Sequence, residues 1–82
     1  MQTREEILKG VTETLQQTFG LDPARLTPQA DLYTDLDIDS IDAIDLLVKL
    51  QQMTGKRMQP EAFKSVRTIQ DVVDAIHQLL NP

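Results

Sequence analysis

Hydrophobic side chains recur every three or four positions in three stretches of the chain, the spacing typical of an amphipathic helix. The stretches cover residues 4–18, 40–54 and 69–80. Their apolar positions are Ile7, Leu8, Val11 and Leu15, with Phe19 just beyond; Ile44, Leu47, Val48 and Leu50; and Ile69, Val72, Val73, Ile76, Leu79 and Leu80. Because no segment alternates apolar and polar residues as a β-strand does, the pattern predicts an all-α protein.

Residues that start and stop helices flank these stretches. A Thr or Asp precedes each stretch, and an acidic residue three positions after the Thr can complete a capping box in the first and third. The N-cap residues are Thr3, Asp39 and Thr68, and the acidic residues of the two capping boxes are Glu6 and Asp71. Gly20 and Gly55 end the first and second stretches. Pro60 suits a first helical position, so we also expect one short helix over 60–64.

The connection between the first two long helices, residues 19–39, is much longer than ordinary helix connections. Such a length indicates a functional loop or one packed by its own side chains, here Leu21, Leu26, Leu32, Tyr33 and Leu36. We therefore expect a four-helix bundle with three main helices, a short third helix and a long first loop. At 82 residues, the chain fits one domain, 1–82.

Composition narrows the function classes. The chain has no cysteine, which excludes disulfides, thiolate metal ligands and a cysteine nucleophile. Its net charge of −5 argues against nucleic acid as a partner, because that affinity comes mostly from neutralising phosphates. No apolar run is long enough to span a membrane, and the N-terminus does not resemble a signal peptide.

The charges are distributed unevenly along the chain. Residues 31–48 carry six aspartates and no basic residue, a net charge of −6, whereas residues 49–67 carry five basic residues and one acid, a net charge of +4. Asp39 and Asp42 suit the first turn of a helix, where the helix dipole stabilises negative charge. The rest of the acidic segment is either a solvated face or a docking surface for a basic partner.

Calcium is an alternative ligand for this segment, because Asp35, Asp37 and Asp39 are spaced like the first ligands of an EF-hand loop. The sixth position is Ser40 instead of the turn glycine, and the twelfth is Leu46 instead of the bidentate glutamate. Both diagnostic positions therefore fail, and we expect no metal site.

Ser40 stands at the start of the second helix, between acidic residues. Ser and Asp are common there as helix caps, so a purely structural role is one interpretation. A hydrolase nucleophile is poorly supported, because the only histidine is His77, near the C-terminus, and no G-x-S-x-G motif surrounds the serine. We expect no catalysis by this chain.

Residues 35–50, DLDIDSIDAIDLLVKL, resemble the prosthetic-group site of acyl carrier proteins. In that family a D-S-[LI] motif opens the second of four helices, and its serine receives 4′-phosphopantetheine. The resemblance extends over nearly the whole chain. It implies Ser40 as the attachment point of a covalent arm that holds acyl groups as thioesters.

The resemblance also implies a partner face beside this serine. Its acidic members would be Asp35, Asp39, Asp42 and Asp45, and its apolar members Ile41, Ile44 and Val48; from the segment charges we expect Lys64 and Arg67 on the same face. The implied partners are a phosphopantetheinyl transferase, a ketosynthase, a ketoreductase, a dehydratase and acyltransferase-type enzymes. We expect a cytoplasmic protein that is monomeric when free.

Departures from the usual pattern bear on the pathway. Asp37 replaces a glycine and Ile41 a leucine of fatty-acid carriers, and the third-helix region is basic and contains Phe63. This favours carriers of type II polyketide-like systems, aryl polyene clusters among them, over housekeeping fatty-acid synthesis. Peptidyl carriers, with Gly-Gly-x-Ser, match less well. The alternative from another class is a helical interaction domain in which Ser40 is only a cap.

Overall fold

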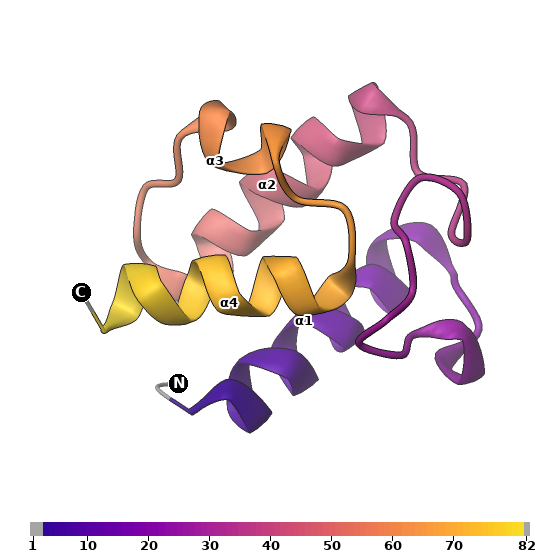
Figure 1. The fold of residues 1–82 in the computed structure, drawn as a ribbon, viewed down its shortest axis with the longest axis horizontal. Coiled ribbons are helices and arrows are strands. Elements are labelled where there is room, and N and C mark those ends of the chain that lie inside the picture. The colour runs from indigo at the N-terminus through magenta and orange to yellow at the C-terminus, as the bar shows by residue number, and fades with distance from the viewer. Residues whose placement is uncertain (1–2, 82) are drawn as a thin grey trace.

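The helices begin and end close to the positions that the sequence predicts. The computed structural model describes residues 3–81, apart from the Ala62 side chain. Within them, α1 is Arg4–Phe19, α2 is Ser40–Thr54, α3 is Pro60–Lys64 and α4 is Ile69–Leu80 (Figure 1). A three-residue 3₁₀ turn, η1 (Pro23–Arg25), is too short to show a hydrophobic period. The all-α class is confirmed; residues 1, 2 and 82 of the expected domain lie outside the described part.

The predicted N-cap residues cap their helices, and of the two predicted capping boxes the one at α4 is complete in the described residues. The Thr3 hydroxyl accepts a hydrogen bond from the Glu6 N–H at 3.2 Å at the start of α1. At the start of α4, the Asp71 N–H donates to Thr68 Oγ1 at 3.1 Å, and the Thr68 N–H donates back to Asp71 Oδ2 at 3.2 Å. This reciprocal pair is a complete capping box, and it fixes where the chain turns into α4.

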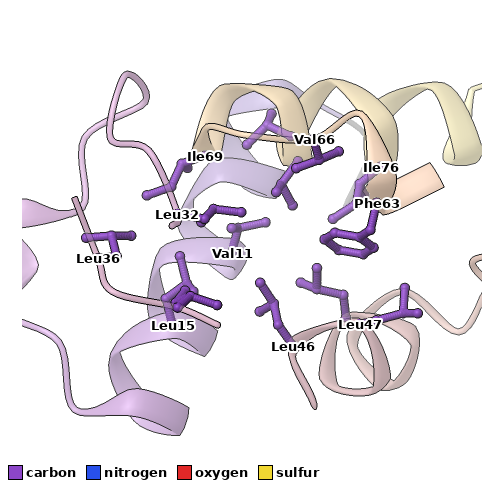
Figure 2. Close-up of a cluster of buried hydrophobic side chains, with 14 of the residues drawn as sticks. Val11, Leu15, Leu32, Leu36, Leu46, Leu47, Phe63, Val66, Ile69 and Ile76 are labelled. Carbon is purple, nitrogen blue, oxygen red and sulfur yellow. The ribbon is translucent and has the colours of Figure 1, made fainter. Parts of the chain in front are cut away.

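One aliphatic core joins the helices. α1 packs against both α4 and α2, and the short α3 packs on α2. Side chains of all four helices and of the long connection meet in the centre (Figure 2). The fully buried ones are Ile7, Val11, Leu15, Leu32, Leu46, Leu50, Ile69, Val72, Val73 and Ile76.

The long connection is packed by its own side chains, as predicted. Five of them are buried: Leu26, Ala30, Leu32, Leu36 and Ile38. Its backbone also pairs with the segment before α4, where Asp31 and Thr68 form an isolated antiparallel bridge. The Leu32 N–H donates to the Arg67 carbonyl at 2.7 Å. The connection is therefore a fixed wall of the core that delivers the chain to the start of α2.

The helices of residues 3–81 are too short or too polar to cross a lipid bilayer.

Candidate functional site

Ser40 is the first residue of α2, and Asp39 is the N-cap. The serine side chain is exposed, and its hydroxyl makes no hydrogen bond to any residue that the structure describes. The alternative in which Ser40 caps the helix is therefore wrong, because the neighbouring aspartate performs the capping. A free hydroxyl at a rigid helix start is accessible to a modifying enzyme.

Asp39 and Asp42 hold this helix start together. The Asp42 N–H donates to Asp39 Oδ1 at 2.8 Å, and the Asp39 N–H donates to Asp42 Oδ2 at 3.5 Å. Both carboxylates thus bond to the backbone on either side of Ser40. Because their negative charge lies at the positive end of the helix dipole, it stabilises α2 as well as setting the local potential.

The backbone before Asp39 is also fixed. Ile38 is buried, and its N–H donates to the Leu32 carbonyl at 2.9 Å. The Asp35 carboxylate accepts from the Asp31 N–H at 2.7 Å, and the Arg25 guanidinium donates to the Asp35 carbonyl. Asp35, predicted as a partner contact, therefore also organises its own loop.

Asp37, between these anchors, has a φ of 57°, in the left-handed region. It is the only residue other than glycine with a positive φ in the described part of the chain. Aspartate adopts this conformation more readily than most residues, but glycine does so without steric cost. The sequence marks this turn only by an aspartate, one of the residue types that adopt a positive φ more often than most.

The outer face of α2 is apolar. Ile41, Ile44 and Val48 are 76%, 63% and 42% exposed, and their spacing places them along one side of the helix. Leu46 and Leu50 are fully buried on the opposite side. The apolar spacing in the sequence placed Ile44 and Val48 among the core positions and did not include Leu46. The reason is that α2 has apolar residues on two faces.

On one side of this stripe, α2 borders α1. Asp45 and Lys49 line an open groove with Thr14, Gln17 and Thr18 of α1 and with Gln52 and Met53 of α2. Asp45 is exposed, so its carboxylate is available on this side of the stripe. Residues 3–81 contain no group of three or more His, Asp or Glu side chains placed to hold a metal ion.

The basic residues lie on the α3 side. Lys64 ends α3 and is exposed; Arg67 follows in the segment before α4, where its Nε lies 3.5 Å from Asp31 Oδ2. Hydrogen bonds from the Thr34 and Tyr33 N–H groups, and then the Arg67 charge, hold the pKa of Asp31 below its usual value of 3.8. Arg67 is thus a structural partner of the first loop as well as a predicted partner contact.

Two features that position the site were not predicted from the sequence. Arg25 reaches the Asp35 carbonyl from η1, and Asp31 joins the first loop to Arg67 and Thr68. The available signal for Asp31 was its position in the acidic segment before a helix, which does not distinguish a loop anchor from a surface charge. Arg25 carries no local signal.

Comparison with known proteins identifies the family. A family model described as a phosphopantetheine attachment site matches residues 9–76. Acyl carrier protein 2 of Ralstonia nicotianae is 55% identical over 78 residues, covering 95% of this chain and 96% of the relative. An acyl carrier protein of Myxococcus xanthus is 38% identical over 76 residues, covering 93% and 96%. A meromycolate extension acyl carrier protein of Mycobacterium leprae is 34% identical over 77 residues, covering 94% and 67%.

Proposed function

The chain belongs to the family of phosphopantetheine-bearing acyl carrier proteins, and from that premise we propose that Ser40 is the attachment point of its arm. Members of this family are non-catalytic carriers with a covalently attached 4′-phosphopantetheine. The thiol of the arm holds the acyl group as a thioester. The observation that supports Ser40 is its exposed hydroxyl, which bonds to none of residues 3–81, beside a cap supplied by Asp39.

The residues around Ser40 suit this role. Attachment joins the serine oxygen to the phosphorus of the arm, breaks the pyrophosphate of coenzyme A and releases 3′,5′-ADP, while the hydroxyl proton passes to the transferase. The positive end of the α2 dipole favours the phosphate that results. The capping box and the buried Ile38 hold the serine at a fixed place, so the transferase meets a pre-formed site.

A partner face extends from this serine along α2. Its exposed apolar stripe, Ile41, Ile44 and Val48, supplies contact area, and the carboxylates around it accelerate association with basic surfaces. The predicted face also includes Asp35, Asp39, Asp42, Asp45, Lys64 and Arg67. Exposed charges give salt-sensitive, short-lived complexes, as a carrier that visits several enzymes requires.

The pathway is part of the proposal. We assign the chain to a type II polyketide-like system, aryl polyene synthesis among them, in preference to housekeeping fatty-acid synthesis. Asp37 in place of glycine and the basic segment 49–67 support this assignment. The proposed partners are the transferase, ketosynthase, ketoreductase, dehydratase and acyltransferase-type enzymes of that system. The proposed state is one cytoplasmic, monomeric carrier domain over 1–82.

Loading with acetyl-coenzyme A tests the carrier function directly. With a broad-specificity phosphopantetheinyl transferase, the chain gains the arm and the acetyl group together, measured as intact mass. Neutral hydroxylamine then removes only the acetyl group, because it cleaves thioesters and leaves phosphodiesters intact. A chain that gains no mass, or whose acetyl group resists hydroxylamine, is not a carrier of this kind.

A further inference from the structure

The exposed apolar stripe of α2 runs between charges of opposite sign. Ile41, Ile44 and Val48 point away from the core, and Asp45 lies on the flank that borders α1, since it shares a groove with Thr14 of that helix. Asp42 adds a second carboxylate within the first turn of α2. This edge of the stripe is therefore acidic near Ser40.

The opposite flank of α2 faces α3. The Gln51 side-chain oxygen accepts from the Met58 N–H at 3.0 Å, which ties this flank to the segment leading into α3. Phe63 of α3 and Leu47 of α2 are both buried in the same core cluster, where α3 packs on α2 (Figure 2). The next residue, Lys64, is exposed and forms no ion pair with any residue in the described part of the chain.

A second basic residue lies toward the Ser40 end of the same flank. The Arg67 carbonyl accepts from the Leu32 N–H at 2.7 Å, and the Leu32 carbonyl accepts from the Ile38 N–H at 2.9 Å. Two hydrogen bonds thus connect Arg67 to the residue two positions before Ser40. The Arg67 guanidinium is paired with Asp31, whereas Lys64 of α3 has no ion-pair partner among the residues that the structure describes.

We propose that this face fits an enzyme surface with an apolar centre, basic side chains opposite Asp42 and Asp45, and carboxylates opposite Lys64. The inference rests on the proposed carrier function and adds the orientation in which a partner enzyme docks on α2. Near Ser40 the stripe has carboxylates on the α1 side and Lys64 on the α3 side, while Lys49 lies farther along the α1 side. Docking against this part of the stripe therefore avoids contact between like charges in only one orientation. A partner with a uniformly basic docking surface meets Lys64 with repulsion, which selects against that partner.

The test uses the arm-bearing carrier and a fatty-acid ketosynthase with a uniformly basic docking surface as the probe. Acyl-transfer kcat/KM is measured against salt for wild type, Lys64→Glu and Lys56→Glu. Lys56 lies beyond the C-terminal end of α2, so its reversal makes the same change in net charge away from the proposed edge. Arg67 is left unchanged, because its reversal would place a carboxylate beside Asp31.

We expect Lys64→Glu to raise kcat/KM about 3- to 10-fold at low salt, a range consistent with reversing one exposed charge pair. The gain should vanish at about 1 M salt, where screening acts over about 3 Å, and Lys56→Glu should give no comparable gain. A ketosynthase in which the basic residue opposite Lys64 is changed to Glu should then favour wild type over Lys64→Glu.

The proposal would be overturned if Lys64→Glu and Lys56→Glu changed kcat/KM equally. It would also be overturned if no basic residue of the ketosynthase, when changed to Glu, made the enzyme favour wild type over Lys64→Glu. Each carrier variant is first checked for gain of the arm by intact mass. A wild-type chain that takes up no arm refutes the proposed function, whereas loaded carriers that respond only to net charge refute this inference alone.

Discussion

Asp39 and Asp42 cap one another across the first turn of α2, with Ser40 between them. The two carboxylates therefore have a structural role in addition to the docking role predicted for them. Removing either one changes the stability of α2 and the charge of the partner face together. The stability of each such variant must therefore be measured together with its kinetics.

Asp39→Asn separates the two roles, because asparagine caps helices as well as aspartate does but carries no charge. We expect Asp39→Asn to lose only the dipole interaction, about 0.3–1 kcal/mol in urea unfolding, and Asp39→Ala to lose about 1 kcal/mol more with the cap. Both should lower kcat/KM for the transferase, by about 1.5- to 5-fold for the loss of one exposed charge pair. Unchanged kinetics in the Asn variant would make Asp39 a cap and nothing more.

Asp37→Gly should stabilise the protein by up to about 1 kcal/mol, because glycine occupies positive φ without steric cost. For a domain of this size, that raises the thermal midpoint by about 4–8 °C. Asp35→Gly is the matched control and should destabilise, since it removes the carboxylate that accepts from the Asp31 N–H at 2.7 Å. If Asp37→Gly lowered the midpoint, its side chain would be making contacts that outweigh the strain.

The helices could be predicted because their signals are local. Apolar spacing located α1, α2 and α4, and the caps at Thr3, Asp39 and Thr68 set their starts to the residue. The proline rule placed α3 at its observed bounds, Pro60–Lys64. The same local signals also predicted that the first loop is packed by its own leucines.

The remaining features depend on contacts between residues far apart in the chain. The bridge between Asp31 and Thr68 is a backbone pairing that leaves no period in the sequence. Likewise, whether Ile44 faces the core or the solvent depends on where α1 and α3 pack, because α2 has apolar residues on both sides. A periodic pattern shows that a helix has an apolar face, but it cannot show which face a neighbour covers.

Ile76→Ala tests the core through α4. Ile76 is fully buried, so its truncation should cost about 2–5 kcal/mol, a large part of the 5–15 kcal/mol typical of a domain. Gln78→Ala, on the exposed side of α4, should stay within about 0.5 kcal/mol of wild type. Urea unfolding measures both, and equal midpoints for Ile76→Ala and wild type would mean that α4 does not close the core.

Acid stability should depend on Asp31 and Asp71. Bonds from the Arg67 and Thr68 N–H groups hold the pKa of Asp71 below its usual value of 3.8, as the loop N–H groups do for Asp31. A depressed carboxyl pKa stabilises the fold above the unfolded-state pKa and ceases to do so as the pH falls through the folded-state value.

The double variant Asp31→Asn with Asp71→Asn should therefore be less stable than wild type at pH 7, and the difference should shrink below about pH 4. Urea unfolding at pH 7, 5, 4 and 3 measures it. If the difference in unfolding free energy between wild type and the double variant stayed constant down to pH 3, the two carboxylates would stabilise the fold by their shape and not by their charge.

Ser40 and Ser65 are the only serines in the chain, and they provide the most direct test of the attachment site. Wild type, Ser40→Ala and Ser65→Ala are incubated with coenzyme A and a broad-specificity transferase, and their intact masses are compared. Because the Ser40 hydroxyl bonds to no described residue, Ser40→Ala should stay folded, within about 0.5 kcal/mol of wild type. Wild type and Ser65→Ala should each gain one 4′-phosphopantetheine and Ser40→Ala none; an arm on folded Ser40→Ala, or none on wild type, would contradict the assignment.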